Sequence, residues 1–65
     1  MAIFTTSKNE ILALDNPGFY VDVVARNKGT IQASWARLDW DEAVERALSA
    51  IEDGLQVEIE EHWQN

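Results

Sequence analysis

The chain has 65 residues, of which 46% are hydrophobic, and it contains no cysteine. Twelve acidic and five basic residues give a net charge of −7. This composition predicts one folded domain over residues 1–65 and excludes a disulfide framework or a thiolate metal site. The charge also argues against direct nucleic-acid binding and against a polybasic membrane contact, because both need clustered cations. No apolar run approaches membrane length, so we expect a cytoplasmic protein.

The N-terminal part predicts a strand near residues 10–14, followed by a proline-glycine turn over residues 15–18. This strand would turn Ile11 toward an outer sheet face. Whether residues 2–6 form a further strand stays open. Two cross-strand pairs would place the leucines on the inner face: Leu12–Val21 and Leu14–Phe19.

A β-hairpin is predicted next, with strands over 19–26 and 30–38. The favoured loop is Asn27-Lys28-Gly29, because three-residue loops commonly end in a left-handed residue and Gly29 tolerates that conformation. This loop puts apolar side chains together on one face. The predicted inner pairs are Ala25–Ile31, Val23–Ala33 and Val21–Trp35.

The clearest element is an amphipathic helix over residues 40–53. Asp39 occupies the N-cap position, Glu42 completes a capping-box pattern, and Gly54 follows the last periodic residue. One face of this helix is apolar, with the spacing i, i+3, i+4, i+7, i+8, i+11: Trp40, Ala43, Val44, Ala47, Leu48 and Ile51.

Alternating residues from Leu55 to Trp63 predict a last strand. Glu61 falls on its apolar side, at the expected rim of the core. The order is then β-β-β-α-β, an α+β domain with an antiparallel sheet of three to four strands and one helix packed on one face. Trp35 and Trp40 are expected in the core, whereas Trp63 covers the edge of the core or anchors a partner. The strand that pairs with this last strand stays open.

The sequence offers little for catalysis, and we expect neither an enzyme nor a cofactor. The single histidine, His62, has no serine near it in sequence. Glu58, Glu60 and His62 share one strand face and could offer a cation three ligands, but a solvated strand face has the same composition. We therefore expect no metal site.

Acidic charge is concentrated in the C-terminal part. Residues 39–65 hold nine acidic residues and only Arg46 as a base, a net charge of −8. The helix dipole favours acidic residues in the first turn, so it does not explain why acidic residues stand at the later positions Glu45, Glu52 and Asp53. Either this face keeps the protein soluble, or it matches a basic partner. The candidate partner-binding residues are Asp41, Glu42, Glu45, Glu52, Asp53, Glu58 and Glu60.

A second candidate surface is the outer face of the sheet. Ile11, Tyr20 and Val24 are expected close together there, surrounded by polar residues. An apolar patch with a polar rim is typical of a contact surface. It would support a homodimer or a partner contact.

Two resemblances add functional expectations. The segment Tyr20–Ile51, in which a hairpin leads into Leu38-Asp39-Trp40-Asp41-Glu42-Ala43, resembles HicB-like antitoxins. That resemblance implies neutralisation of a small basic toxin. In size and charge the chain is also similar to small acidic phage-encoded inhibitors of host defence, such as anti-CRISPR proteins and DNA mimics.

The predicted function is therefore a non-enzymatic inhibitor that blocks a basic surface of a nucleic-acid-handling protein. An antitoxin and a homodimeric structural or assembly protein are the alternatives.

Overall fold

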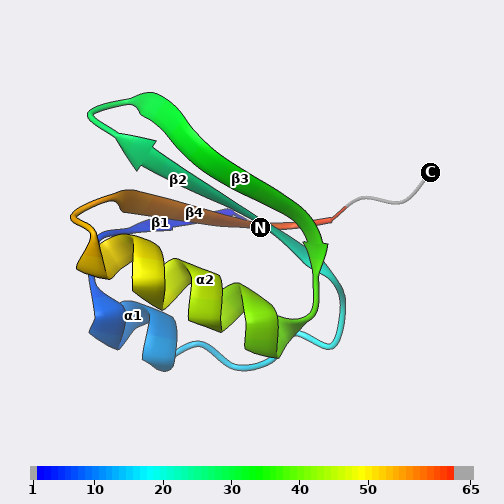
Figure 1. Cartoon of the computed structure of the whole chain (residues 1–65). Helices are drawn as coiled ribbons and strands as arrows, with labels where there is room; N and C mark the ends of the chain where they lie inside the picture. Colours follow the sequence, from blue (N-terminus) through cyan, green and yellow to red (C-terminus); the bar gives the residue numbers. More distant parts are fainter. Residues whose placement is uncertain (1, 63–65) are drawn as a thin grey trace.

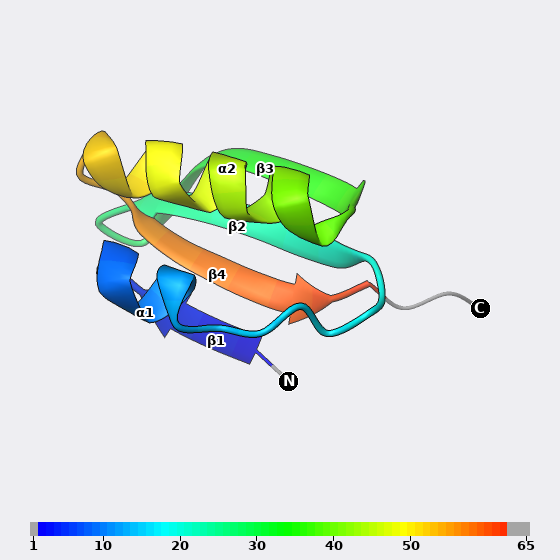
Figure 2. The same cartoon turned by 90° about the horizontal axis from the view of Figure 1, so that it is seen from below.

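The structure, a computed structural model that describes residues 2–62, consists of one four-stranded antiparallel sheet and two helices on the same face of that sheet (Figures 1 and 2). The strand order in the sheet is β1-β4-β2-β3. This arrangement confirms the predicted α+β class. In chain order the elements are β1 (Ala2–Thr5), α1 (Lys8–Leu12), β2 (Val21–Asn27), β3 (Thr30–Leu38), α2 (Trp40–Glu52) and β4 (Gln56–Glu61).

Helix α2 begins and ends close to the predicted positions. The Asp39 side chain accepts a hydrogen bond from the Glu42 N–H, as an N-cap residue does. At the other end, Gly54 has a φ of 83°, and the Leu55 N–H donates to the Ala50 carbonyl. Together with the bond from the Gly54 N–H to the Ile51 carbonyl, this forms a Schellman motif. The predicted Asp39 N-cap and the glycine after the helix are therefore confirmed.

The core lies between the helices and the inner face of the sheet. Helix α2 contributes alanines, whose small side chains let it pack closely on β2 and β4. Trp35 and Trp40 pack against the core but stay partly exposed. The buried hydrophobic residues are Ile11, Val21, Val23, Ala25, Leu38, Ala43, Ala47, Ala50, Val57 and Ile59.

The strand predicted near residues 10–14 is wrong, because these residues belong to α1 and the loop after it. The Ser7 side chain caps α1 by accepting from the Glu10 N–H. Ile11 is fully buried, whereas Leu12 is 64% exposed, the reverse of the predicted strand. The predicted pairs of Leu12 and Leu14 with the start of β2 are absent, since β2 pairs with β3 and β4.

The β2–β3 hairpin forms with a register different from the predicted one. Asn27 pairs with Thr30, so the loop is the two-residue turn Lys28-Gly29. One extra residue in β3 shifts the register at each of two places. These bulges keep apolar residues on the inner face although the loop is one residue shorter than predicted. The observed pairs there are Ala25–Ala33, Val23–Trp35 and Val21–Leu38.

Strand β4 settles the two topological questions that the sequence left open. It lies in the middle of the sheet, between β1 and β2. Residues 2–5 form β1, an edge strand paired with β4. No helix covers the outer face of the sheet in the part of the chain described (Figure 1). The prediction for Trp63 lies outside the described residues.

Candidate functional site

The solvent-facing side of α2 carries most of the predicted acidic residues. Because Ala43, Ala47 and Ala50 face the sheet, the acidic positions of the helix turn toward solvent. Arg46 is the basic residue of this helix. We call this surface the acidic face of α2; its members, all exposed, are Asp41, Glu42, Glu45, Glu52 and Asp53.

Two of these carboxylates have cationic partners. Glu42 lies 3.6 Å from Arg46 one turn later, and Glu52 lies 2.5 Å from the Lys8 Nζ of α1. The hydrogen bond from Lys8, together with its positive charge, lowers the pKa of Glu52. Lys8 therefore supplies a local reason for an acid near the negative end of the helix, which the sequence alone did not reveal.

The remaining acidic residues of this face have no cationic partner of this kind within residues 2–62. Asp41, Glu45 and Asp53 take part in no ion pair within residues 2–62. The helix dipole favours Asp41 in the first turn. Glu45 and Asp53 have no comparable stabilisation, so they are the residues of this face whose charge the fold itself does not use.

Glu58 and Glu60 do not belong to the same surface, which corrects the predicted single acidic patch. Their neighbours Val57 and Ile59 are buried beneath the helices, so the two glutamates point to the outer sheet face. There Glu58 lies 2.5 Å from the Arg26 guanidinium and has a side chain only 14% exposed. Glu58 is thus neutralised within the molecule.

The predicted apolar patch on the outer sheet face does not assemble. Ile11 is buried in α1 on the opposite side of the sheet. Val24 lies on the outer face, partly buried, at a position paired with Glu58. Tyr20 precedes β2 and is 45% exposed. Of the three predicted residues, only Val24 lies on the central part of that face.

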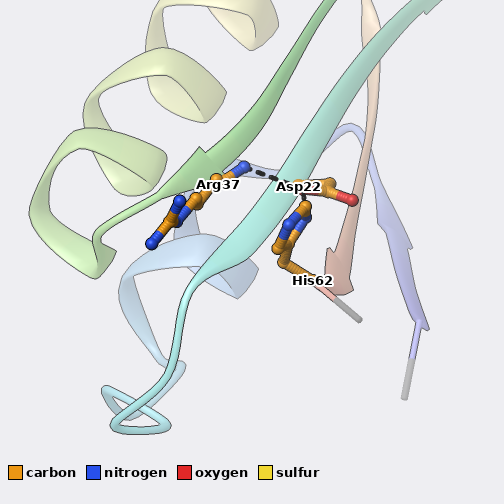
Figure 3. Close-up of polar contacts among 3 residues, drawn as sticks. All are labelled: Asp22, Arg37 and His62. Carbon is orange, nitrogen blue, oxygen red and sulfur yellow. Dashed lines mark hydrogen bonds and ion pairs between the residues drawn. The ribbon is translucent and has the colours of Figure 1, made fainter. Parts of the chain in front are cut away.

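A polar cluster at one end of the sheet was not predicted (Figure 3). The Asp22 Oδ1 accepts from the Arg37 backbone N–H at 2.9 Å and lies 2.7 Å from His62 Nδ1. The backbone N–H of His62 donates to the Tyr20 carbonyl at 3.0 Å. Arg37 also places its guanidinium 5.2 Å from the centre of the Tyr20 ring. These contacts tie the ends of β3 and β4 to the start of β2.

This cluster changes the interpretation of His62. The sequence suggested Glu58 and Glu60 as its partners on one strand face, but the contact is with Asp22 on the neighbouring strand. Within residues 2–62 no three His, Cys, Asp or Glu side chains lie close enough together to hold a metal ion. The missing signal was the β2–β4 pairing, because only that pairing brings residues 40 positions apart into contact.

An open hollow of about 700 Å³ adjoins this cluster and the start of α2. Its wall combines three aromatic side chains with two carboxylates, those of Asp39 and Glu61. We call it the aromatic hollow; it is lined by Asn16, Gly18, Phe19, Tyr20, Asp39, Trp40, Glu61 and His62. None of these lining residues is a lysine or an arginine.

No protein-family model matches the chain, and neither a curated protein nor a solved structure matches it. Neither helix in residues 2–62 has the length and hydropathy needed to cross a membrane.

Proposed function

We propose that the protein is a non-enzymatic inhibitor that acts in the cytoplasm by covering a basic, nucleic-acid-binding surface of another protein. The observation that carries this proposal is the acidic face of α2, where Glu45 and Asp53 are exposed and have no ion-pair partner within residues 2–62. Carboxylates that do nothing for the fold are free to attract a partner of opposite charge.

The charge balance of the two layers favours the helix layer as the docking side. On the outer sheet face, Glu58 is paired with Arg26, and Asp22 contacts His62. Pairing within the molecule weakens the field that such carboxylates project into solvent. Glu60 is the outer-face carboxylate without an ion pair within residues 2–62, whereas the acidic face of α2 has three: Asp41, Glu45 and Asp53. The acidic face of α2 therefore contributes more of the attraction toward a basic surface, and complementary charge of this kind mainly speeds association and selects partners.

Blocking nucleic acid is the mechanism that this surface suits. A protein that binds nucleic acid through phosphates must present clustered lysine and arginine side chains. A row of carboxylates on a rigid helix competes for the same side chains. The net charge of −7 adds long-range attraction toward such a surface and repels nucleic acid itself.

The homodimeric alternative keeps one specific observation in its favour. Phe4 and Ile31, on the two edge strands, are 55% and 56% exposed. Exposed apolar residues on edge strands favour association between sheets. A wild type that stays monomeric at high concentration would contradict this alternative. A dimer that persists in the Phe4→Lys, Ile31→Lys double variant would contradict association through these two edges.

The test of the main proposal uses a matched pair of charge reversals. Glu45→Lys and Glu60→Lys change the net charge equally, but Glu45 lies on the acidic face of α2 and Glu60 on the outer sheet face. Basic proteins from the source cells are first enriched on phosphocellulose and captured on the immobilised chain. The association rate of the purified partner is then measured with each variant.

We expect Glu45→Lys to slow association by about tenfold and to flatten its dependence on salt, whereas Glu60→Lys has a much smaller effect. Equal effects of the two variants would show that only net charge matters. That result, or an unchanged rate for Glu45→Lys, rejects the acidic face of α2 as the docking surface.

A further inference from the structure

The aromatic hollow has walls of an unusual kind for a small acidic protein. Phe19 and Tyr20 are 42% and 45% exposed, and Trp40 joins them from the first turn of α2. Large aromatic side chains are normally covered in a fold of this size, because each can bury much apolar area. Three of them around one open hollow therefore offer ring surface to a ligand.

Carboxylate groups lie beside these rings and can accept hydrogen bonds. Glu61 and Asp39 bring carboxylates to the wall. Asp39 uses Oδ1 to cap α2. His62 has its Nδ1 engaged by Asp22, so Nε2 is the ring nitrogen left for other contacts (Figure 3). Among residues 2–62 no lysine or arginine lines the wall, although the Arg37 guanidinium lies over the Tyr20 ring. A cation that enters the hollow therefore meets the carboxylates of Asp39 and Glu61 in the wall.

Aromatic faces together with carboxylates are the surroundings that a guanidinium group prefers. It stacks on aromatic rings and donates two parallel hydrogen bonds to a carboxylate, whereas an ammonium group can do neither in the same way. The molecule contains an internal example, because the Arg37 guanidinium lies over the Tyr20 ring at 5.2 Å. Arg37 is not among the residues that line the hollow.

The hollow is also continuous with the acidic face of α2. Asp39 and Trp40, which line it, lead directly into the helix turn that carries Asp41 and Glu42. A basic surface docked on α2 therefore has its side chains within reach of the hollow. We propose that the aromatic hollow binds an arginine side chain of the basic partner and anchors it there, an inference that rests on the proposed function.

The first test uses N-acetyl-arginine amide as the probe, with the full chain. Amide and indole NMR signals are followed during titration, and N-acetyl-lysine amide is the comparison. We expect saturable binding with the largest shifts at Phe19, Tyr20, Trp40 and Glu61, and weaker binding of the lysine probe. Diffuse shifts along every acidic segment, equal for both probes, would overturn the proposal.

Two neutralising variants sharpen this test. Glu61→Gln removes a carboxylate of the hollow and should weaken arginine-amide binding by about five- to tenfold. Glu10→Gln removes one exposed carboxylate from α1, outside both the hollow and the acidic face of α2, and should leave binding unchanged. If Glu10→Gln weakens binding as much as Glu61→Gln, general charge attraction is responsible and the proposal fails. Tyr20→Leu, which keeps the backbone carbonyl bonded to His62, should also weaken binding.

The last test separates this inference from the proposed function. With the purified partner, Glu61→Gln should speed dissociation, whereas Glu45→Lys slows association. If Glu61→Gln leaves dissociation unchanged while Glu45→Lys still slows association, the arginine anchor is rejected and the proposed function stands. If Glu61→Gln speeds dissociation of a complex that still binds nucleic acid, the anchor stands and the proposed function is rejected.

Discussion

Lys28 illustrates how a single residue can hide a turn from sequence reasoning. Its φ of 51° and the φ of 87° at Gly29 are those of a type I′ turn. Both central residues of such a turn need a positive φ, so Asn-Gly and Asp-Gly are favoured there. Lysine rarely adopts this left-handed conformation. The prediction instead used Gly29 as the single left-handed residue of a three-residue loop, and the predicted register followed from that loop.

Lys28→Asn should stabilise the protein. Asparagine adopts the left-handed conformation more readily than lysine, so the change relieves local strain in the turn. We expect a gain of about 0.5–1 kcal/mol in the free energy of unfolding, measured by chemical denaturation. Lys28→Val, which adds a β-branch at the same φ, should destabilise; the opposite order of the two variants would contradict the turn.

Asp22→Ala should destabilise the protein, because the Asp22 carboxylate holds the start of β2 to both β3 and β4. It accepts from the Arg37 N–H and contacts His62, so its removal leaves both groups without this partner. We expect a loss of about 1–3 kcal/mol in the free energy of unfolding. Glu45→Ala, on the exposed side of α2, should change stability by less than about 0.5 kcal/mol. Equal small losses would show that the Asp22 cluster contributes little.

At the scale of elements, long sequence patterns predicted their helix or strand correctly, and short ones did not. The amphipathic period of α2 extends over three turns, and its caps agree with it, so its limits could be predicted closely. Helix α1 has five residues, too few for a helical period to appear. Leu12 and Leu14 alternate with other residues as in a strand, which led to the wrong prediction. Ser7, followed by Glu10 three residues later, was the pattern that correctly indicated the start of a helix.

A pair of adjacent variants tests whether α1 is a helix in the core. Ile11 is fully buried and Leu12 is 64% exposed. Ile11→Ala should lower the free energy of unfolding by about 2–4 kcal/mol, whereas Leu12→Ala should change it by less than about 0.5 kcal/mol. A strand at residues 10–14 predicts the reverse order.

The contact between α1 and α2 makes a pH-dependent prediction. Lys8 lowers the pKa of Glu52, so Lys8→Gln should return that pKa toward its usual range. A carboxyl group with a lowered folded-state pKa stabilises the fold above its unfolded pKa, and this contribution is lost as the pH falls through the folded pKa. NMR titration of the Glu52 side chain measures the pKa directly; no change on Lys8→Gln would contradict the ion pair.

At the scale of the whole molecule, the amount of acidic charge could be predicted from the composition, but its division between two faces could not. Counting charge over residues 39–65 combined Glu58 and Glu60 with the acids of α2. The alternation in β4 separates them, since burial of Val57 and Ile59 turns the glutamates away from the helices. Likewise, the residues that line the aromatic hollow come from the loop before β2, the start of α2 and the end of β4. Their proximity depends on strand pairing, which the sequence alone does not reveal.

The most direct test of the account is a displacement measurement. The captured basic partner is loaded with a fluorescent oligonucleotide, and wild type, Glu45→Lys or Glu60→Lys is added while fluorescence anisotropy is followed. We predict that the wild type and Glu60→Lys release the oligonucleotide and that Glu45→Lys requires about tenfold more protein to do so. Formation of a ternary complex, in which the oligonucleotide stays bound while the wild-type protein saturates the partner, would contradict the central claim.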